Sequence, residues 1–525
     1  MIVKSRFIEI YDTTLRDGAQ GVGISFSLQD KISLTLKLDE FGIPFIEGGW
    51  PFSNPKDEEF FKAIKNYHLK YAKITAFGST KRKDVKPEND ENLNAIIDCG
   101  VDYATIFGKA WTLHVREVLK VKLHDNLDMI YDSISYLRDH GIKVIFDVEH
   151  FYDGYKEDPE YAIKVLEVAW EAGAERLVLC DTNGGTLTHE FYEITKKICE
   201  KFGSSIGVHC HNDSGLAVAN SLMAVIAGAV HVQGTINGIG ERCGNADLCQ
   251  VIPALELKMG LKALRKANGL QELKTLSTFV YDLVGMDPNP YQPYTGQYAF
   301  AHKAGAHSDG VIKVSRAYEH IDPSLVGNER LITVSELSGR SAIVYKARKF
   351  GLNLDRNDSV VLKVLRTVKE LESSGKRYED ADGSLYLLIL KSMGKYRPHF
   401  EVLSWTVTSR ASKTGVKSLC NIKLKVKGRI IASTAEGIGP VHAQDLALVE
   451  ALKSEYPCIE AVRLMNYKVS IVGRSAGTAS VVRVLIEFEG NGEYWSTAGS
   501  SANILEASME ALVDGYEFYL HRREP

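Results

Sequence analysis

Two histidines separated by a single residue, His209 and His211, have a spacing that suggests chemistry. They follow a short apolar run, residues 205–208, which is typical of the end of a β-strand. Side chains alternate between the two faces of a strand, so both imidazoles point the same way and Cys210 points away from them. Such a pair can bind a metal ion, although an isolated pair is also found where two histidines are simply buried. Polar residues at other predicted strand ends favour the metal.

Asp17 and Asn245 supply oxygen atoms that would complete such a site. With the two histidines they give one carboxylate, two imidazoles and one amide oxygen, which leaves two positions on an octahedral divalent ion. Mn²⁺, Mg²⁺ and Zn²⁺ all suit this set. A 2-keto acid would fill both positions, and the ion would polarise its carbonyl toward attack. Arg16 could then stabilise the developing alkoxide, or it could form only a local salt bridge with Asp17.

The segments that must position these residues repeat as a strand followed by a helix. The first helix should begin at Ser27, with Asp30 completing a capping box, and end at Gly42. Eight such units within about 250 residues predict a TIM barrel, in which the carboxyl ends of all strands meet on one rim. A doubly wound open sheet would spread the same residues along an edge, and the strand count favours the barrel. The predicted strands are 7–11, 44–47, 73–77, 103–107, 143–148, 176–180, 207–211 and 230–234.

We expect four regions: a catalytic barrel over 1–270, a linker subdomain over 271–330 that contributes to the active site, a helical subdomain over 331–394, and a C-terminal regulatory domain over 395–525. The last region contains a near-repeat, because Ser-Thr precedes a predicted helix both at Ser433 and at Ser496. This predicts a duplicated α/β module. The Ser and Thr residues could be ordinary N-caps, or the two helix N-termini could form a site for a small anion or an amino-acid carboxylate.

Composition excludes several classes of function. The chain has 525 residues and a net charge of −4 without a basic stripe, so nucleic acid is not an expected partner. The apolar run 216–230 is too short to span a membrane, and residues 1–7 lack the apolar core of a signal peptide. The eight cysteines are scattered, which fits small core residues in a reduced, cytoplasmic protein. A thiolate role stays open for Cys210 and Cys243.

Three ordered motifs resemble those of the DRE-TIM metallolyases. They are residues 12–20, 209–221 and 237–246. Essentially the whole chain resembles the Claisen-condensing branch of isopropylmalate, homocitrate and citramalate synthases. Segments 47–57, 106–111 and 146–155 are more similar to the long-form citramalate synthases. The glycines of the third motif follow the last strand of the predicted barrel, so we reject a dinucleotide-binding interpretation.

This resemblance implies a homodimeric acyltransferase of isoleucine biosynthesis that condenses acetyl-CoA with pyruvate. It also implies inhibition by an amino acid at the C-terminal domain, and the amino acid expected there is isoleucine. It implies acid–base work for Glu149, a contact of Thr182 with the keto-acid carboxylate, and His307 and Tyr318 completing the site of the partner subunit. From the residues alone, His302 and His307 are not distinguishable. Cofactor binding, here of acetyl-CoA, is expected at Asn237, Gly238, Gly240 and Glu241.

Three alternatives remain at this point. The first is an isopropylmalate or homocitrate synthase, which would use the same site for another keto acid. The second is a retro-Claisen enzyme such as hydroxymethylglutaryl-CoA lyase, which the duplicated C-terminal module disfavours. The third is an amino-acid sensor whose barrel has lost activity, which the complete set of metal-binding residues disfavours.

Overall fold

The computed structural model describes residues 6–413, 415–473 and 477–523. Residues 1–5, which include most of the segment considered for a signal peptide, lie outside the described residues. The chain folds into two compact units. The first comprises residues 1–300 and 321–329, and the second comprises 301–320 and 330–525.

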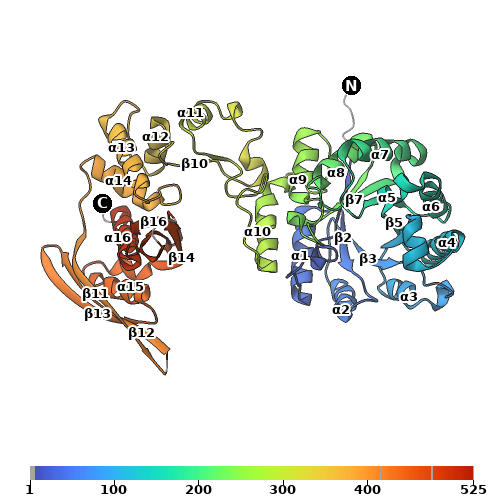
Figure 1. Cartoon of the computed structure of the whole chain (residues 1–525), viewed down its shortest axis with the longest axis horizontal. Coiled ribbons are helices and arrows are strands. Elements are labelled where there is room, and N and C mark those ends of the chain that lie inside the picture. Colours follow the sequence, from blue (N-terminus) through green and yellow to red (C-terminus); the bar gives the residue numbers. More distant parts are fainter. Residues whose placement is uncertain (1–5, 414, 474–476, 524–525) are drawn as a thin grey trace. The chain divides into compact units, whose positions relative to one another are not determined.

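The first unit contains a closed barrel of eight parallel strands, which confirms the predicted fold (Figure 1). The strands pair in sequence order, and the last pairs with the first through the register Glu9↔His231. Each predicted strand is present, with ends shifted by up to two residues. The bounds are β1 Glu9–Asp12, β2 Phe45–Gly49, β3 Lys73–Ser79, β4 Tyr103–Lys109, β5 Lys143–Glu149, β6 Arg176–Asp181, β7 Ile206–Cys210 and β8 His231–Gly234.

Helices follow the strands and lie around the outside of the barrel (Figure 1). The first begins as predicted, because the Ser27 hydroxyl accepts from the Asp30 N–H and the Asp30 carboxylate accepts from the Ser27 N–H. It ends at Gly42 with φ of 100°, a conformation that glycine adopts without strain. The bounds are α1 Leu28–Phe41, α2 Pro55–Ile64, α3 Glu91–Asp98, α4 Leu123–Asp139, α5 Phe151–Glu157, α6 Pro159–Glu171, α7 Thr188–Phe202, α8 Ala217–Ala227, α9 Leu248–Pro253 and α10 Leu273–Val284.

Charged groups close the amino-terminal end of the barrel. Glu9 at the start of β1 accepts two hydrogen bonds from Arg176 of β6, at 2.8 and 2.9 Å, and lies 3.4 Å from Nδ1 of His231. Burial raises the pKa of Glu9, but His231 and Arg176 outweigh it and lower that pKa to about 2. This cluster links three strands at the end opposite to the rim where barrel enzymes do chemistry.

The second unit begins with short strands and a set of helices. Helices α12, α13 and α14 lie within the predicted helical stretch, and α12 begins at Arg340. Their apolar faces share a core that includes Val311, Ile343 and Val364. The bounds are β9 Ala301–His302, α11 Gly305–Lys313, β10 Leu331–Ile332, α12 Arg340–Lys349, α13 Ser359–Ser373 and α14 Asp382–Ser392.

The C-terminal part of this unit is a duplicated module, as predicted. Each copy has three antiparallel strands followed by a helix. The first strand of each copy has a register shift in the equivalent place, between Val402 and Ser404 and between Leu464 and Asn466. The bounds are β11 Phe400–Ser412, β12 Gly415–Val426, β13 Arg429–Gly437, α15 Pro440–Leu452, β14 Arg463–Val472, β15 Val481–Gly490, β16 Glu493–Ser501 and α16 Ile504–Arg523.

The prediction that Ser433 and Ser496 cap helices is wrong. Ser433 lies inside β13 opposite Ile422, and Ser496 lies inside β16 opposite Glu487. The strands continue for several residues beyond each Ser-Thr pair, and the N-cap of α15 is Gly439, which makes no side-chain cap. The Ser-Thr pairs therefore alternate across a sheet.

Two further expectations are answered by this fold. Six of the eight cysteines are buried, whereas Cys243 is exposed and Cys458 is half-buried, so the core interpretation holds for six. No helix in the described part of the chain combines the length and the apolar character that a membrane span requires. The boundaries of the four-region plan stay predictions.

Candidate active site

The structure brings Asp17, His209 and His211 together at the carboxyl ends of the strands. The two Nε2 atoms lie 3.2 Å apart, and they lie 3.6 and 3.9 Å from Oδ2 of Asp17. All three residues are buried. Three donor atoms at these separations can surround one divalent cation, because a metal with bonds of about 2.1 Å holds its ligands roughly 3–3.5 Å apart.

Asn245 adds a fourth donor to this group. Its amide N–H donates to Oδ1 of Asp17 at 2.9 Å, while its Oδ1 is buried and has no hydrogen-bond partner among the described residues. An unpaired buried acceptor is costly unless something binds it. A metal ion supplies such a partner, so the residues present fit the ion that the sequence predicts.

Glycines allow Asn245 to approach the cluster. A Cβ atom on Gly240 would lie 2.2 Å from Nδ2 of Asn245, and one on Gly244 would lie 1.8 Å from the carbonyl oxygen of Gly238. Both glycines also have positive φ values, 149° and 84°. The loop after β8 must therefore be rich in glycine to place an amide beside the carboxylate.

A buried glutamine that the sequence analysis missed orients His209. Oε1 of Gln233 accepts from Nδ1 of His209 at 3.0 Å, and Nε2 of Gln233 donates to Oδ1 of Asp147 at 2.9 Å. A proton held on Nδ1 leaves Nε2 of His209 free to bind a metal. The signal was a polar residue inside an apolar strand, but only the β7–β8 register, His209↔Gln233, pairs it with the histidine.

The electrostatics keep these donors in the form that binds metal. Burial alone raises the pKa of Asp17, but Arg16 and the two imidazoles hold it well below its usual range. Burial and His211 lower the pKa of His209 to about 3, and burial lowers the pKa of His211. Metal ligands must be deprotonated, and these three groups are deprotonated at neutral pH. Burial raises the pKa of the Cys210 thiol, which argues against a thiolate there.

Arg16 lies between two carboxylates. Its Nε donates to Glu47 at 2.6 Å, and one terminal nitrogen donates to Asp17 at 3.0 Å. Its guanidinium carbon lies 3.8 Å from the ring centroid of Phe77. Glu47 is itself buried and accepts from the Tyr11 hydroxyl at 2.7 Å. The contact with Asp17 is thus part of a network that fixes Arg16 at the edge of the metal cluster.

A cavity of about 210 Å³ opens onto the cluster. Trp50, Phe77 and Phe107 form an aromatic wall, with the rings of Phe77 and Phe107 stacked 5.5 Å apart. Glu149 lines the cavity and is ion-paired with Lys109, which the sequence analysis missed. A polar floor beside an aromatic wall is typical of sites for small molecules with one charged end.

Thr182 also lines this cavity. Its hydroxyl oxygen accepts from the backbone N–H of His150, the residue before α5, at 2.9 Å. A hydroxyl that accepts one hydrogen bond still has its own hydrogen to donate. Arg242 binds the Thr182 carbonyl at 2.7 Å and Asp213 at 2.7 and 2.9 Å, so this side of the cavity is held in place.

The predicted cofactor-binding residues have different surroundings. Glu241 lines the cavity. Asn237 points instead toward α10, where it donates to the Ser277 carbonyl at 2.9 Å and accepts from the Ser277 hydroxyl at 2.6 Å. Gly238 and Gly240 shape the loop. Their assignment to acetyl-CoA stays a prediction.

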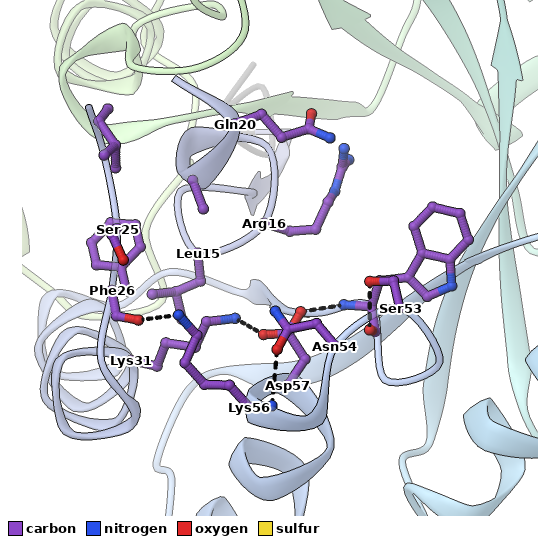
Figure 2. Close-up of a pocket in the computed structure, with 13 residues that line it drawn as sticks. Leu15, Arg16, Gln20, Ser25, Phe26, Lys31, Ser53, Asn54, Lys56 and Asp57 are labelled. Atoms are coloured by element: carbon purple, nitrogen blue, oxygen red, sulfur yellow. Dashed lines mark hydrogen bonds and ion pairs between the residues drawn. The ribbon is translucent and has the colours of Figure 1, made fainter. Parts of the chain in front are cut away.

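A second cavity of about 280 Å³ shares Arg16, Gln20 and Trp50 with the first. Figure 2 shows Arg16 and Gln20 on one side of it and Lys31, Lys56 and Asp57 on another. Lys31 is buried and ion-paired with Asp57. The two cavities therefore adjoin at Arg16.

His307 and Tyr318 lie together in the second unit, with ring centroids 4.6 Å apart, and both are exposed. His302 is buried, and its Nε2 lies 3.3 Å from Glu319, which also pairs with Arg330. The structure thus distinguishes the two histidines that the sequence left equivalent. His302 supports the fold, whereas His307 faces outward.

Comparison with known families divides the chain into three segments. Residues 7–280 match the HMGL-like family, residues 294–376 match the homocitrate synthase post-HMGL domain-like family, and residues 379–520 match the LeuA allosteric (dimerisation) domain. The order of these matches agrees with the order of the regions that the sequence predicts.

Relatives match over nearly the full length. The (R)-citramalate synthase of Sulfolobus acidocaldarius is 52% identical over 99% of this chain and 98% of its own. That of Geobacter sulfurreducens is 48% identical over 98% of both chains. The 2-isopropylmalate synthase of Methanocaldococcus jannaschii is 34% identical over 98% of this chain and 95% of its own. The resemblance found in the sequence is confirmed, and the chain belongs to the (R)-citramalate synthase family.

Proposed function

We propose that this chain condenses acetyl-CoA with pyruvate and hydrolyses the resulting thioester to release (R)-citramalate and CoA. The observation that carries the proposal is a group of buried donors: Asp17, His209 and His211 line a small aromatic-walled cavity, and Asn245 lies against Asp17. Full-length identity of 52% to an (R)-citramalate synthase supports the same reaction.

These four donors would hold a divalent ion, Mn²⁺, Mg²⁺ or Zn²⁺, which when bound would polarise the carbonyl group of the keto acid. Arg16, held beside the cluster by Glu47, stabilises the negative charge that develops on the keto oxygen as the carbonyl is attacked. The Thr182 hydroxyl donates to the carboxylate of pyruvate. Arg16 follows β1 and Thr182 follows β6, and each is held by a buried partner, Glu47 and the backbone of His150.

Glu149 is the candidate base. The methyl protons of a thioester are far less acidic than any side chain, so a positioned base must remove one as the carbon–carbon bond forms. Glu149 lines the cavity and is held by Lys109. Water then attacks the thioester carbonyl, and CoA leaves as the thiol.

The aromatic wall of Trp50, Phe77 and Phe107 accounts for the preference for pyruvate. The three aromatic rings bound the space for the side chain of the keto acid, which is a methyl group in pyruvate and an isopropyl group, with two more carbons, in 2-ketoisovalerate. Forcing extra methylenes into a packed site costs roughly 1–3 kcal/mol. This observation favours citramalate over isopropylmalate synthesis.

The adjoining cavity (Figure 2) would take the thioester end of acetyl-CoA, because it meets the pyruvate cavity at Arg16. Gly238, Gly240, Glu241 and Asn237 would shape the loop that faces the same substrate. The acetyl group and the keto carbon would then meet beside the guanidinium group of Arg16, where the two cavities adjoin.

Regulation and assembly complete the proposal. The chain acts as a homodimer in which the exposed His307 and Tyr318 complete the active site of the partner subunit. The duplicated C-terminal module, which matches a LeuA allosteric (dimerisation) domain, binds isoleucine as a feedback inhibitor. We place the enzyme in the cytoplasm, in the biosynthesis of isoleucine.

Release of free thiol from acetyl-CoA, measured with a panel of 2-keto acids, tests the function. The proposal expects rapid release with pyruvate and much slower release with 2-ketoisovalerate and 2-ketoglutarate. Thiol release that occurs only with 2-ketoisovalerate would instead make the chain an isopropylmalate synthase. Cleavage of hydroxymethylglutaryl-CoA without any condensation would make it a lyase.

A further inference from the structure

A second group of potential metal ligands lies in the C-terminal module. It consists of His399, which precedes β11, and Glu517 and His521, which lie one turn apart on α16. Oε2 of Glu517 is 3.1 Å from Nδ1 of His399 and 3.6 Å from Nε2 of His521. All three ligand atoms lie within 4.8 Å of one another.

These separations match those expected around one ion. A tetrahedral zinc ion with bonds of about 2.1 Å holds its ligands roughly 3.4 Å apart, between the two observed distances. The catalytic group has similar separations, 3.6 and 3.9 Å from its carboxylate oxygen to its two imidazoles. The two clusters share one carboxylate and two histidines, and they belong to different compact units.

Glu517 carries a charge that lacks an ordinary counterion. It is completely buried, and its ion-pair partners in the described part of the chain are the two histidines, with no lysine or arginine among them. Its Oε1 atom already accepts from the backbone N–H groups of His399 and Phe400, at 2.9 and 3.2 Å. Burying a carboxylate without a cation is expensive, so a positive charge is expected beside Oε2.

His521 independently indicates a ligand at this place. It is 7% exposed, and its Nε2 is buried without a hydrogen-bond partner among the described residues. Its ring also hydrogen-bonds the backbone of Arg397, which must involve the other ring nitrogen and favours a proton there. Nε2 then presents a lone pair toward a carboxylate oxygen 3.6 Å away. Two groups that both accept repel each other unless a proton or a metal ion lies between them.

We propose that His399, Glu517 and His521 bind one divalent cation, preferably Zn²⁺, as a structural site separate from the catalytic centre. Zn²⁺ is preferred because two imidazoles and one carboxylate at tetrahedral separations suit it better than Mg²⁺ or Ca²⁺, which favour oxygen. Water occupies the fourth position. The ion joins the last turns of α16 to the segment that enters β11, and so fixes one edge of the duplicated module.

The test uses the full-length protein with its catalytic metal site removed by His209→Gln. The protein is stripped with a chelator, supplied with Zn²⁺ alone, passed through a desalting column, and its zinc content is measured by mass spectrometry. The proposal expects one zinc ion per chain. Adding His521→Gln or, separately, His399→Gln should remove it, whereas His442→Gln, an exposed histidine in the same module, should not.

Circular dichroism of each variant checks that the module is still folded. If a variant unfolds, its zinc content is not used. X-ray absorption spectroscopy of the His209→Gln protein is measured instead, and the zinc should be coordinated by two imidazoles and oxygen. The proposal is overturned if the His209→Gln protein binds no zinc, or if its zinc survives both added substitutions. A shell that contains sulfur overturns it as well. None of these measurements depends on the proposed reaction.

Discussion

Replacing Gln233 with methionine should weaken metal binding at the catalytic centre without a direct change to any ligand. Gln233 is completely buried and holds the proton of His209 on Nδ1 through a 3.0 Å hydrogen bond. Methionine has a similar shape but does not accept strongly. The proton can then move to Nε2 and point toward Asp17, and an incoming metal ion must displace it.

The expected decrease in metal affinity follows from the loss of the hydrogen bond between Gln233 and His209. Removing the partner of a ligating histidine typically costs 10–100-fold in metal affinity, or about 1.4–2.7 kcal/mol. The loss of the hydrogen bonds from Gln233 to His209 and Asp147 also leaves buried polar atoms unpaired, which destabilises the barrel by about 1–3 kcal/mol. Competition with a coloured chelator measures the metal affinity, and chemical denaturation measures the stability.

Two further variants separate metal binding from stability. Gln233→Glu keeps an oxygen that accepts from His209. Burial raises the pKa of neighbouring Asp147, and the protonated carboxyl group of Asp147 can donate to the new glutamate. The metal affinity of this variant should therefore stay near that of the wild type. Gln292→Met is the matched control, because Gln292 is also buried and also hydrogen-bonds side chains, those of Asp247 and Tyr281 at 2.9 Å and that of Asn237 at 3.2 Å. It should lose stability but keep its metal. Equal metal affinity in Gln233→Met and the wild type would refute the reasoning.

Three other predictions follow from the structure. Gly240→Ala should release the metal, because its Cβ would lie 2.2 Å from the Asn245 amide. Gly23→Ala is the control, because Gly23 also has a positive φ but has open space around it, and this variant should keep its metal in the same chelator titration. Glu9→Gln should destabilise the barrel by about 2 kcal/mol at pH 7. This figure is the free energy that corresponds to lowering the pKa of Glu9 to about 2, reduced because solvent screens the interactions of this partly exposed group. Because that pKa is depressed in the folded state, the difference from wild type in denaturation should be full above about pH 4.5 and shrink toward pH 2; a constant difference would count against it. Deleting the chain after Gly394 should reduce inhibition by isoleucine in the thiol-release assay, and unchanged inhibition would place the effector elsewhere.

The barrel could be predicted because its strands are short apolar runs with polar residues at their carboxyl ends. Strand alternation was enough to place His209 and His211 on one face, and barrel closure brought Asp17 to them from the first strand. Each of these inferences needs only the period of a strand and the order of the units.

Other features depend on which atoms meet across strands, which one sequence does not encode locally. Gln233 acts on His209 only through the register of β7 and β8. The same limit explains the error at Ser433 and Ser496, since Ser and Thr before a helix suggest a cap until the strand is seen to continue. His302 and His307 differ only in burial, which depends on where Glu319 lies.

Anomalous X-ray diffraction from crystals of the active protein loaded with Mn²⁺ tests the central claim most directly. The account predicts a strong peak about 2.0–2.3 Å from the carboxylate of Asp17, Nε2 of His209 and His211, and Oδ1 of Asn245. Crystals of protein that turns over pyruvate and acetyl-CoA, yet show no metal among these four residues, would contradict it.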